Sequence, residues 1–181
     1  TKYISGHSDN FCGLVACSYN NYLKIKSTAT KFGDYVHSES CVTAIRGLRT
    51  LETRMNQHSK NAKLVYNFLN KSKIVKDIFF LPDKKNKNHK LWKKYFCLSN
   101  GLITFSILKK NNISDFLDNL QIFKIGFSWG GFESLILPIN ALSPIKKSSK
   151  NSVFWFRIHV GLESSGDLIK DLKKGFYEYE K

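Results

Sequence analysis

The chain has 181 residues, of which 42% are apolar and 14% aromatic, and it carries a formal net charge of +15. This composition suffices for a buried core, so the chain need not be disordered. The sequence contains no apolar run of membrane length, so we expect a cytoplasmic protein without a membrane partner. The cysteines lack the spacing of metal ligands, which predicts no metal site and reduced thiols that pack as small core residues: Cys12, Cys17, Cys41 and Cys97.

The positive charge is mostly lysine, because the chain has only the arginines Arg46, Arg49, Arg54 and Arg157. It accompanies many Asn, Ile, Phe and Tyr residues, a bias typical of A/T-rich codons. The densest basic run, DKKNKNHKLWKKYF (83–96), has no repeated basic-aromatic spacing suited to stacking bases. We interpret it as a solvated loop that leads into a packed segment around Trp92 and Phe96, and expect no nucleic-acid partner.

The first regular element in chain order is a long helix. Apolar residues from Val42 to about Lys71 recur at spacings of three, four and seven, which predicts an amphipathic helix able to bridge two domains. Two strands follow, in IVKDIFF ahead of Pro82 and in GLITFSIL (101–108). The segment NNISDFLDNL then predicts a short helix that begins near Ser114.

The last third of the chain continues with a strand ending in IFKIGF, a strand in SVFWFRIHV (152–160), and a helix in ESSGDLIKDLKKGFYEY. Ser164 and Ser165 are candidate caps for this helix. This order predicts an α/β chain whose C-terminal domain is α+β, with a mainly antiparallel sheet covered by helices. The apolar stripe of the last helix comprises Leu168, Ile169, Leu172 and Phe176.

Lys2 is the first candidate for chemistry, in the opening segment TKYISGHSD. A lysine amine in a polar turn that contains Gly6 suits a nucleophile forming a Schiff base with an aldehyde cofactor. The alternative is an exposed lysine near a frayed terminus, and these residues alone favour that alternative.

Two further patches are candidates. In FSWGGFES (127–134), paired glycines allow close approach of the main chain to a ligand beside Ser128 and Trp129, although a simple tight turn is equally compatible. In VFWFRIHVGLE, alternation places Arg157 on one face with Trp155 and His159, opposite an apolar face. An arginine there requires an anionic partner, which is either a bound carboxylate or a structural Asp or Glu.

Taken together, these motifs resemble the pyridoxal-phosphate-dependent enzymes of cysteine and methionine metabolism, a family of fold type I. The segments TKYISGHSD, RGLRTLETRMNQHSKNA, LPDKKNKNHKLWKKYF, GLITFSILKK, FSWGGFESLI and FRIHVGLESSGDLIKDLKKGF follow the order of this family over essentially the whole chain. Within this family, Trp129 in SWGG makes the chain resemble the cystathionine beta-lyases more than the gamma-acting relatives. The latter tend to carry a smaller aliphatic residue at this position.

The resemblance implies a role for each candidate residue. Lys2 matches the lysine that holds pyridoxal 5'-phosphate covalently and moves the proton from the substrate Cα. Thr1 matches a residue that contacts the cofactor phosphate, and Arg157 matches the arginine that pairs with the substrate α-carboxylate, beside Ser128 and Trp129. The implied reaction is β-elimination of cystathionine to homocysteine, pyruvate and ammonia, a step of methionine biosynthesis.

The resemblance also implies a domain organisation. The family places its phosphate loop, its ring-stacking aromatic residue and the acid at the pyridine nitrogen upstream of the lysine, so we expect a C-terminal fragment of a homotetramer. Residues 1–48 would be the tail of the large cofactor domain, with apolar surface exposed before residue 42, and 49–181 the small domain. The alternatives are an inactive half that packs with an N-terminal half, a gamma-acting relative and a basic nucleic-acid binder.

Overall fold

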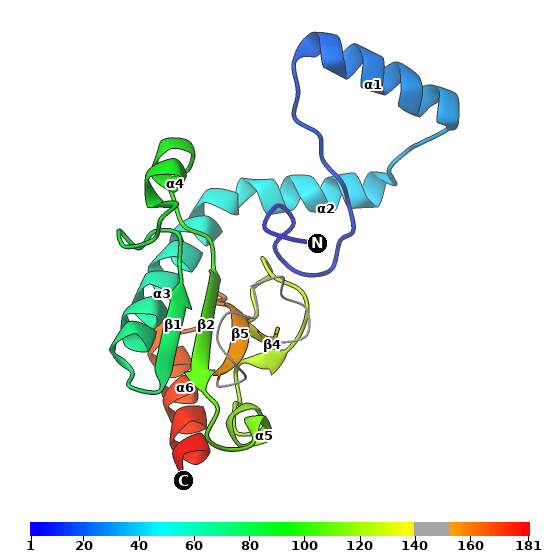
Figure 1. Cartoon of the computed structure of the whole chain (residues 1–181). Helices are drawn as coiled ribbons and strands as arrows, with labels where there is room; N and C mark the ends of the chain where they lie inside the picture. Colours follow the sequence, from blue (N-terminus) through cyan, green and yellow to red (C-terminus); the bar gives the residue numbers. More distant parts are fainter. Residues whose placement is uncertain (140–152) are drawn as a thin grey trace.

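The computed structural model describes residues 1–139 and 153–181. Figure 1 shows a sheet with helices packed beside it, and an arm formed by the first two helices. In chain order the elements are α1 (Tyr19–Phe32), α2 (Ser38–Arg49), α3 (Leu51–Lys71), β1 (Val75–Phe79), α4 (His89–Tyr95), β2 (Leu102–Leu108), α5 (Ile113–Leu117), β3 (Lys124–Ile125), β4 (Leu135–Pro138), β5 (Val153–His159) and α6 (Ser165–Glu180).

Five strands of the described residues form one sheet in the order β1-β2-β5-β4-β3. The pairs β1-β2, β2-β5 and β5-β4 are antiparallel, and β3 runs parallel to β4. In the central pair, Thr104 of β2 lies opposite Arg157 of β5, and Phe105 lies opposite Phe156. The mainly antiparallel sheet predicted from the sequence is therefore confirmed, with β4 as a strand that was not predicted.

The core lies between one face of this sheet and the helices α3, α5 and α6 (Figure 1). Alternation in the strands and the helical period in α3 and α6 direct apolar side chains into it. The predicted apolar face of β5 and stripe of α6 are both confirmed as parts of this core. Its fully buried side chains include Val65, Leu69, Phe105, Phe156, Ile158, Leu168 and Leu172.

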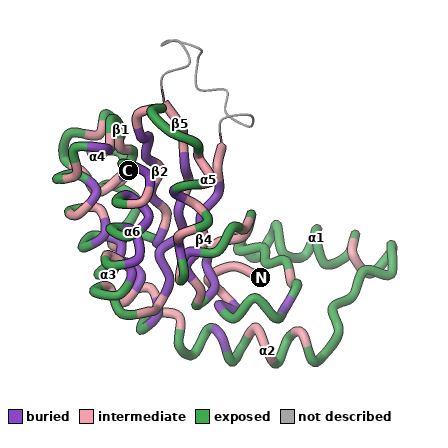
Figure 2. Tube along the Cα trace, turned by 90° about the horizontal axis from the view of Figure 1, so that it is seen from below, coloured by how far each residue is buried: buried purple, intermediate pink, exposed green. Residues whose placement is uncertain are grey.

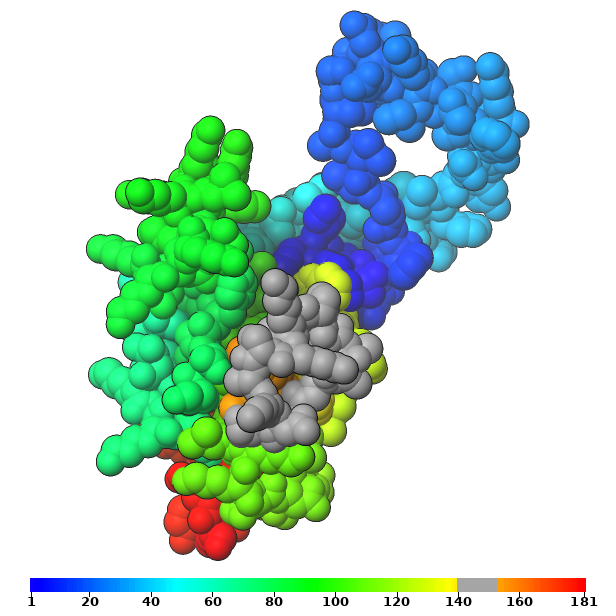
Figure 3. Space-filling view, in the orientation of Figure 1, coloured from blue at the N-terminus to red at the C-terminus, as the bar shows by residue number. Residues whose placement is uncertain are grey.

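Residues 11–48 form an arm that contributes almost nothing to this core. Helix α1 has no buried residue, and Gly47 is the one buried residue of α2. The burial colours of Figure 2 are mostly green along both helices, and Figure 3 shows the arm projecting from the rest of the molecule. Phe11 is 92% exposed and Tyr35 is 79% exposed. The expected apolar surface before residue 42 is thus present.

Two predictions about local structure need correction. The helix predicted from Val42 is divided into α2 and α3, which meet at Thr50, and its apolar residues Ile45 and Leu48 stay exposed because the arm has no packing partner among the described residues. The basic run predicted as a loop contains α4, and Phe96 is 61% exposed rather than packed.

The prediction that the cysteines are core residues is also wrong. Cys12 is half-buried, and Cys17, Cys41 and Cys97 are exposed free thiols. Three of the four lie on the arm or at its root, where no core is available to bury them.

Asp171 fixes the segment between α5 and β3 to helix α6. Its carboxylate is 6% exposed and accepts hydrogen bonds from the main-chain N–H groups of Gln121, Ile122 and Phe123, at 2.7, 2.9 and 3.0 Å. Charge-assisted bonds of this kind are stronger than bonds between neutral groups. The Asp171 carboxylate therefore accepts the main-chain hydrogen bonds that a neighbouring strand would otherwise accept from residues 121–123, which lead directly into β3.

We predict that Asp171→Ala lowers the free energy of unfolding by about 3–5 kcal/mol, because three main-chain donors lose their acceptor together. Urea denaturation of the purified chain measures this change. The control is Asp167→Ala in the same helix, where the carboxylate forms a surface ion pair with Lys170 at 3.3 Å. That substitution should cost less than about 1 kcal/mol. Equal losses in the two variants would contradict the anchoring role of Asp171.

Candidate active site

The opening residues form a turn that is held in place by Arg54 of helix α3. The main-chain N–H of Gly6 donates to Lys2 O at 2.8 Å, and Gly6 has a φ of +74°. The Arg54 guanidinium donates to Tyr3 O at 2.7 Å and Ile4 O at 3.2 Å. A Cβ at Gly6 would collide with this guanidinium. The glycine therefore allows the turn to lie against Arg54, with Lys2 on its outer side.

Lys2 reaches a loop far along the chain. Its Nζ donates to the Ser128 hydroxyl at 2.8 Å and lies 4.1 Å from the centroid of the Trp129 ring. Gly130, with a φ of +83°, makes this approach possible, since a Cβ there would lie 2.7 Å from Tyr3 N. The paired glycines were expected to let the main chain approach a ligand; in the structure Gly130 instead lies against the main chain of Lys2 and Tyr3.

Arg157 enters the same cluster from the middle of β5. Its Nη2 donates to Phe127 O at 2.6 Å, and its Cζ lies 5.3 Å from the Trp129 ring centroid. Its Nε is buried without a hydrogen-bond partner, and no carboxylate in residues 1–139 and 153–181 forms an ion pair with it. The structural ion pair considered from the sequence is thus not found within the described residues, and one N–H of this guanidinium is left without an acceptor.

His159 was not predicted to be a site residue, yet it supports this loop. Its Nε2 lies 3.1 Å from both Gly130 N and Gly131 O, so the imidazole bonds to one of them according to its tautomer. The rings of Tyr3 and His58 pack around it, with centroids 5.8 and 5.2 Å away. The sequence signal was the alternation that places His159 on the same face as Arg157.

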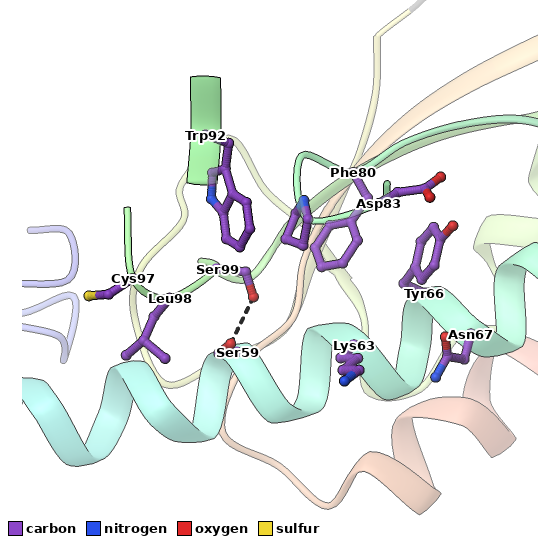
Figure 4. Close-up of a pocket in the computed structure, with 11 residues that line it drawn as sticks. Ser59, Lys63, Tyr66, Asn67, Phe80, Asp83, Trp92, Cys97, Leu98 and Ser99 are labelled. Carbon is purple, nitrogen blue, oxygen red and sulfur yellow. Dashed lines mark hydrogen bonds between the residues drawn. The ribbon is translucent and has the colours of Figure 1, made fainter. Parts of the chain in front are cut away.

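Three hollows lie near this region. One of about 340 Å³ is lined by Thr1 and Lys2, and one of about 470 Å³ is lined by Arg157. A third of about 310 Å³, between α3 and the segment before β2, has Trp92 toward one end and Tyr66 with Asp83 toward the other (Figure 4). None of the predicted site residues lines the third hollow, so it is separate from the candidate site.

The structure therefore brings together four of the five predicted site residues: Lys2, Ser128, Trp129 and Arg157. Thr1 lines the cavity of about 340 Å³ together with Lys2, and Arg157 does not line it. Within the residues described, no helix has the length and apolar character needed to cross a membrane. An amine, a hydroxyl, an aromatic ring and a guanidinium thus converge from segments more than 120 residues apart.

Comparison with known proteins identifies the family of the chain. Residues 1–177 match the protein family described as Cys/Met metabolism PLP-dependent enzyme. The chain belongs to this family. It is 35% identical to the cystathionine beta-lyase MetC of Escherichia coli, over 97% of this chain and 46% of that protein. It is 36% identical to the L-alanine/L-glutamate racemase of Wolbachia pipientis, over 95% of this chain and 44% of that protein. The chain thus spans less than half the length of these relatives.

A solved structure agrees with this assignment. The fold is similar to that of cystathionine gamma-lyase from Lactobacillus plantarum, with a TM-score of 0.88 and 26% identity, over 99% of this chain and 49% of that chain. Members of the family depend on pyridoxal phosphate. The residues present fit such a group: the Lys2 amine is half-buried, hydrogen-bonded to a neutral hydroxyl, and borders a cavity of about 340 Å³.

We predict that His159 makes stability fall as the pH is lowered. Burial lowers the pKa of His159 to about 4 in the folded chain, from an ordinary value of 6.5. The unfolded chain therefore binds this proton more readily, and stability falls from about pH 6.5 to about pH 4 and then levels off. The total loss is about 3 kcal/mol, from 1.36 kcal/mol per pKa unit.

Unfolding free energies of the chain and of His159→Gln, measured between pH 7 and 4, test this prediction. The variant should lose about 3 kcal/mol less than the chain over this range. His37→Gln, at an exposed histidine, is the control and should follow the unmodified chain. Parallel curves for all three proteins would show that His159 is not the titrating group.

Proposed function

We propose that this chain is the C-terminal part of a pyridoxal-phosphate-dependent carbon–sulfur lyase that removes the sulfur substituent of cystathionine by β-elimination. The products are homocysteine, pyruvate and ammonia, as needed for methionine biosynthesis. The observation that carries the proposal is the hydrogen bond between Lys2 Nζ and Ser128 Oγ beside Arg157. This arrangement places the Lys2 amine and the Arg157 guanidinium, which can bind a carboxylate, beside the same Trp129 ring.

Lys2 is the proposed attachment point of the cofactor and the group that takes the proton from the substrate Cα. Its hydrogen bond to Ser128 and its contact with the Trp129 ring hold the amine in one orientation, which a proton transfer requires. Thr1, beside it in the cavity, is the proposed contact of the cofactor phosphate. Bound pyridoxal phosphate supplies the ring that stabilises negative charge at Cα.

Arg157 is the proposed binding group for the substrate α-carboxylate. Its Nη2 is fixed by Phe127 O, whereas the buried Nε has no partner in the described part of the chain. A planar guanidinium binds a carboxylate through two parallel bonds, which fixes the orientation of Cα. Because Arg157 comes from the central strand β5, this orientation has a rigid support.

The whole protein would act as a homotetramer, a dimer of dimers, in the cytoplasm. Residues 1–48 would belong to the large cofactor domain and residues 49–181 to the small domain. The break between α2 and α3 at Thr50 and the low burial of the arm support a division near this point. A beta-lyase and a racemase are relatives at similar identity, which supports chemistry at Cα in each case.

We predict that Lys2 is the lysine modified when the protein is incubated with pyridoxal phosphate and reduced with borohydride. Mass spectrometry should find the reduced adduct on Lys2, and Lys2→Ala should lose it together with the visible absorbance of bound cofactor. The protein used is this chain joined to, or mixed with, the residues that relatives carry before the matched region. A cofactor adduct that persists in Lys2→Ala would remove Lys2 from its proposed role.

Arg157→Lys is the matched variant in the same experiment. It keeps the positive charge but loses the fork, so the adduct should remain while kcat/KM for pyruvate release falls about 30- to 1000-fold, equivalent to about 2–4 kcal/mol. Near-normal turnover would contradict the proposed carboxylate contact, as would loss of the cofactor from this variant.

The exposed arm favours a second candidate function, a catalytically inactive half that only packs with an N-terminal half. Its large apolar side chains are exposed over residues 11–48, and burying them gains about 25 cal/mol per Å². Such a half would bind a partner chain without turning over cystathionine. A gamma-acting relative stays a further candidate, because the fold is similar to that of a cystathionine gamma-lyase. No contact in the described residues supports the basic nucleic-acid binder.

Limited proteolysis tests the arm. We predict that trypsin or chymotrypsin cleaves the isolated chain between residues 11 and 37 and spares α3 and β2, because α1 has no buried side chain while α3 and β2 lie in the core. Addition of an N-terminal half should protect the arm in both candidate functions, and pyruvate release then distinguishes them. An arm that resists cleavage in the isolated chain would show that its apolar surface is already covered.

A further inference from the structure

The cavity of about 470 Å³ beside Arg157 has a chemical character that the proposed reaction does not by itself require. It opens on the sheet face that carries Arg157 and Thr104, which lie opposite each other in β5 and β2. Helix α3 and the segment between β1 and β2 close its other sides. We call it the side-chain cavity.

The side-chain cavity carries one positive charge and no negative charge among the described residues that line it. Arg157 supplies the charge, and Asp and Glu are absent from the lining. Tyr3 also lines it, but burial raises the pKa of Tyr3 to about 12, so its hydroxyl stays neutral and accepts a hydrogen bond from Gly101 N at 2.9 Å. The cavity therefore favours an anion at one end, and no carboxylate among its described lining residues is available to pair with an ammonium group.

The remaining walls are mostly apolar and partly open. Met55 and Leu102 are half-buried, while Phe79 is 45% and Phe96 is 61% exposed. Apolar side chains around a hollow gain free energy when a ligand removes them from water. Thr104 and Asn100 add neutral polar groups, which cannot balance a buried charge.

We propose that the side-chain cavity binds a monocarboxylate with an apolar tail, so that the enzyme prefers amino acids with an uncharged S-alkyl side chain. The carboxylate pairs with Arg157, and the tail lies against Phe79, Phe96 and Met55. This inference rests on the proposed function, because it assigns the substrate side chain to the cavity beside the carboxylate-binding arginine. Cystathionine, whose side chain ends in a second ammonium and carboxylate, is then a poorer substrate than an S-alkyl cysteine of similar length.

Binding to the full chain without cofactor tests the cavity directly. Calorimetric titration with acetate, butyrate and hexanoate should show affinity rising about fourfold per methylene group, as expected for burial of CH₂. 6-Aminohexanoate, which adds a terminal amine to hexanoate, should lose most of the affinity that hexanoate gains over acetate. Arg157→Gln should lose binding of the whole series, and Phe79→Ala should keep acetate binding but flatten the rise. Tyr177→Ala, an exposed aromatic residue on α6 outside the cavity, is the control and should change nothing.

The cofactor-loaded protein adds a second comparison. S-propylcysteine should exceed S-(3-aminopropyl)cysteine in kcat/KM at least tenfold, since the two differ by one terminal ammonium group. A flat carboxylate series with equal turnover of both substrates would overturn the cavity assignment and leave the lyase intact. A rising series without elimination from any substrate would support the cavity and reject the lyase. Binding that survives in Arg157→Gln would overturn the inference.

Discussion

The geometry of the candidate site depends on Arg54, which fixes the opening turn before any ligand is present. Its guanidinium is 6% exposed and bonds to oxygens of Tyr3, Ile4, Gly47 and Thr50 rather than to a carboxylate of the described chain. A buried cation without partners is costly, and these four acceptors offset that cost. Arg54 therefore selects one arrangement of turn, α2 and α3, in which Lys2 faces the loop of Ser128.

The second half of the site is fixed by strand β5. Arg157 and His159 are two residues apart and so project from the same face, where one bonds to Phe127 O and the other to the main chain at Gly130 or Gly131. The loop that carries Ser128 and Trp129 is thus held at both ends by one central strand. A site supported in this way keeps its geometry more precisely than a free loop would.

These supports explain what the sequence could and could not predict. Periodicity was sufficient for β2, β5 and α6, because local patterns decide which face of each element is buried, and it also placed Arg157 on the polar face. It could not predict the contact of Lys2 with Ser128, since the two are 126 residues apart and no local pattern encodes the pair. Periodicity also misjudged Ile45 and Leu48, which continue an apolar stripe but have no described surface to pack against.

The site lies where the poorly buried arm meets the well-packed sheet domain. Lys2 comes from the opening turn that precedes the arm, whereas Ser128, Trp129 and Arg157 come from the sheet domain. Gly47 of α2 lies directly against Ile4 and Ser5 of the opening turn, where a Cβ would collide with their main chain. A movement of α2 would therefore shift the turn that carries the Lys2 amine, and Arg54, which bonds to both the turn and Gly47 O, opposes such a movement. The same guanidinium thus ties the position of the amine to the junction of α2 and α3.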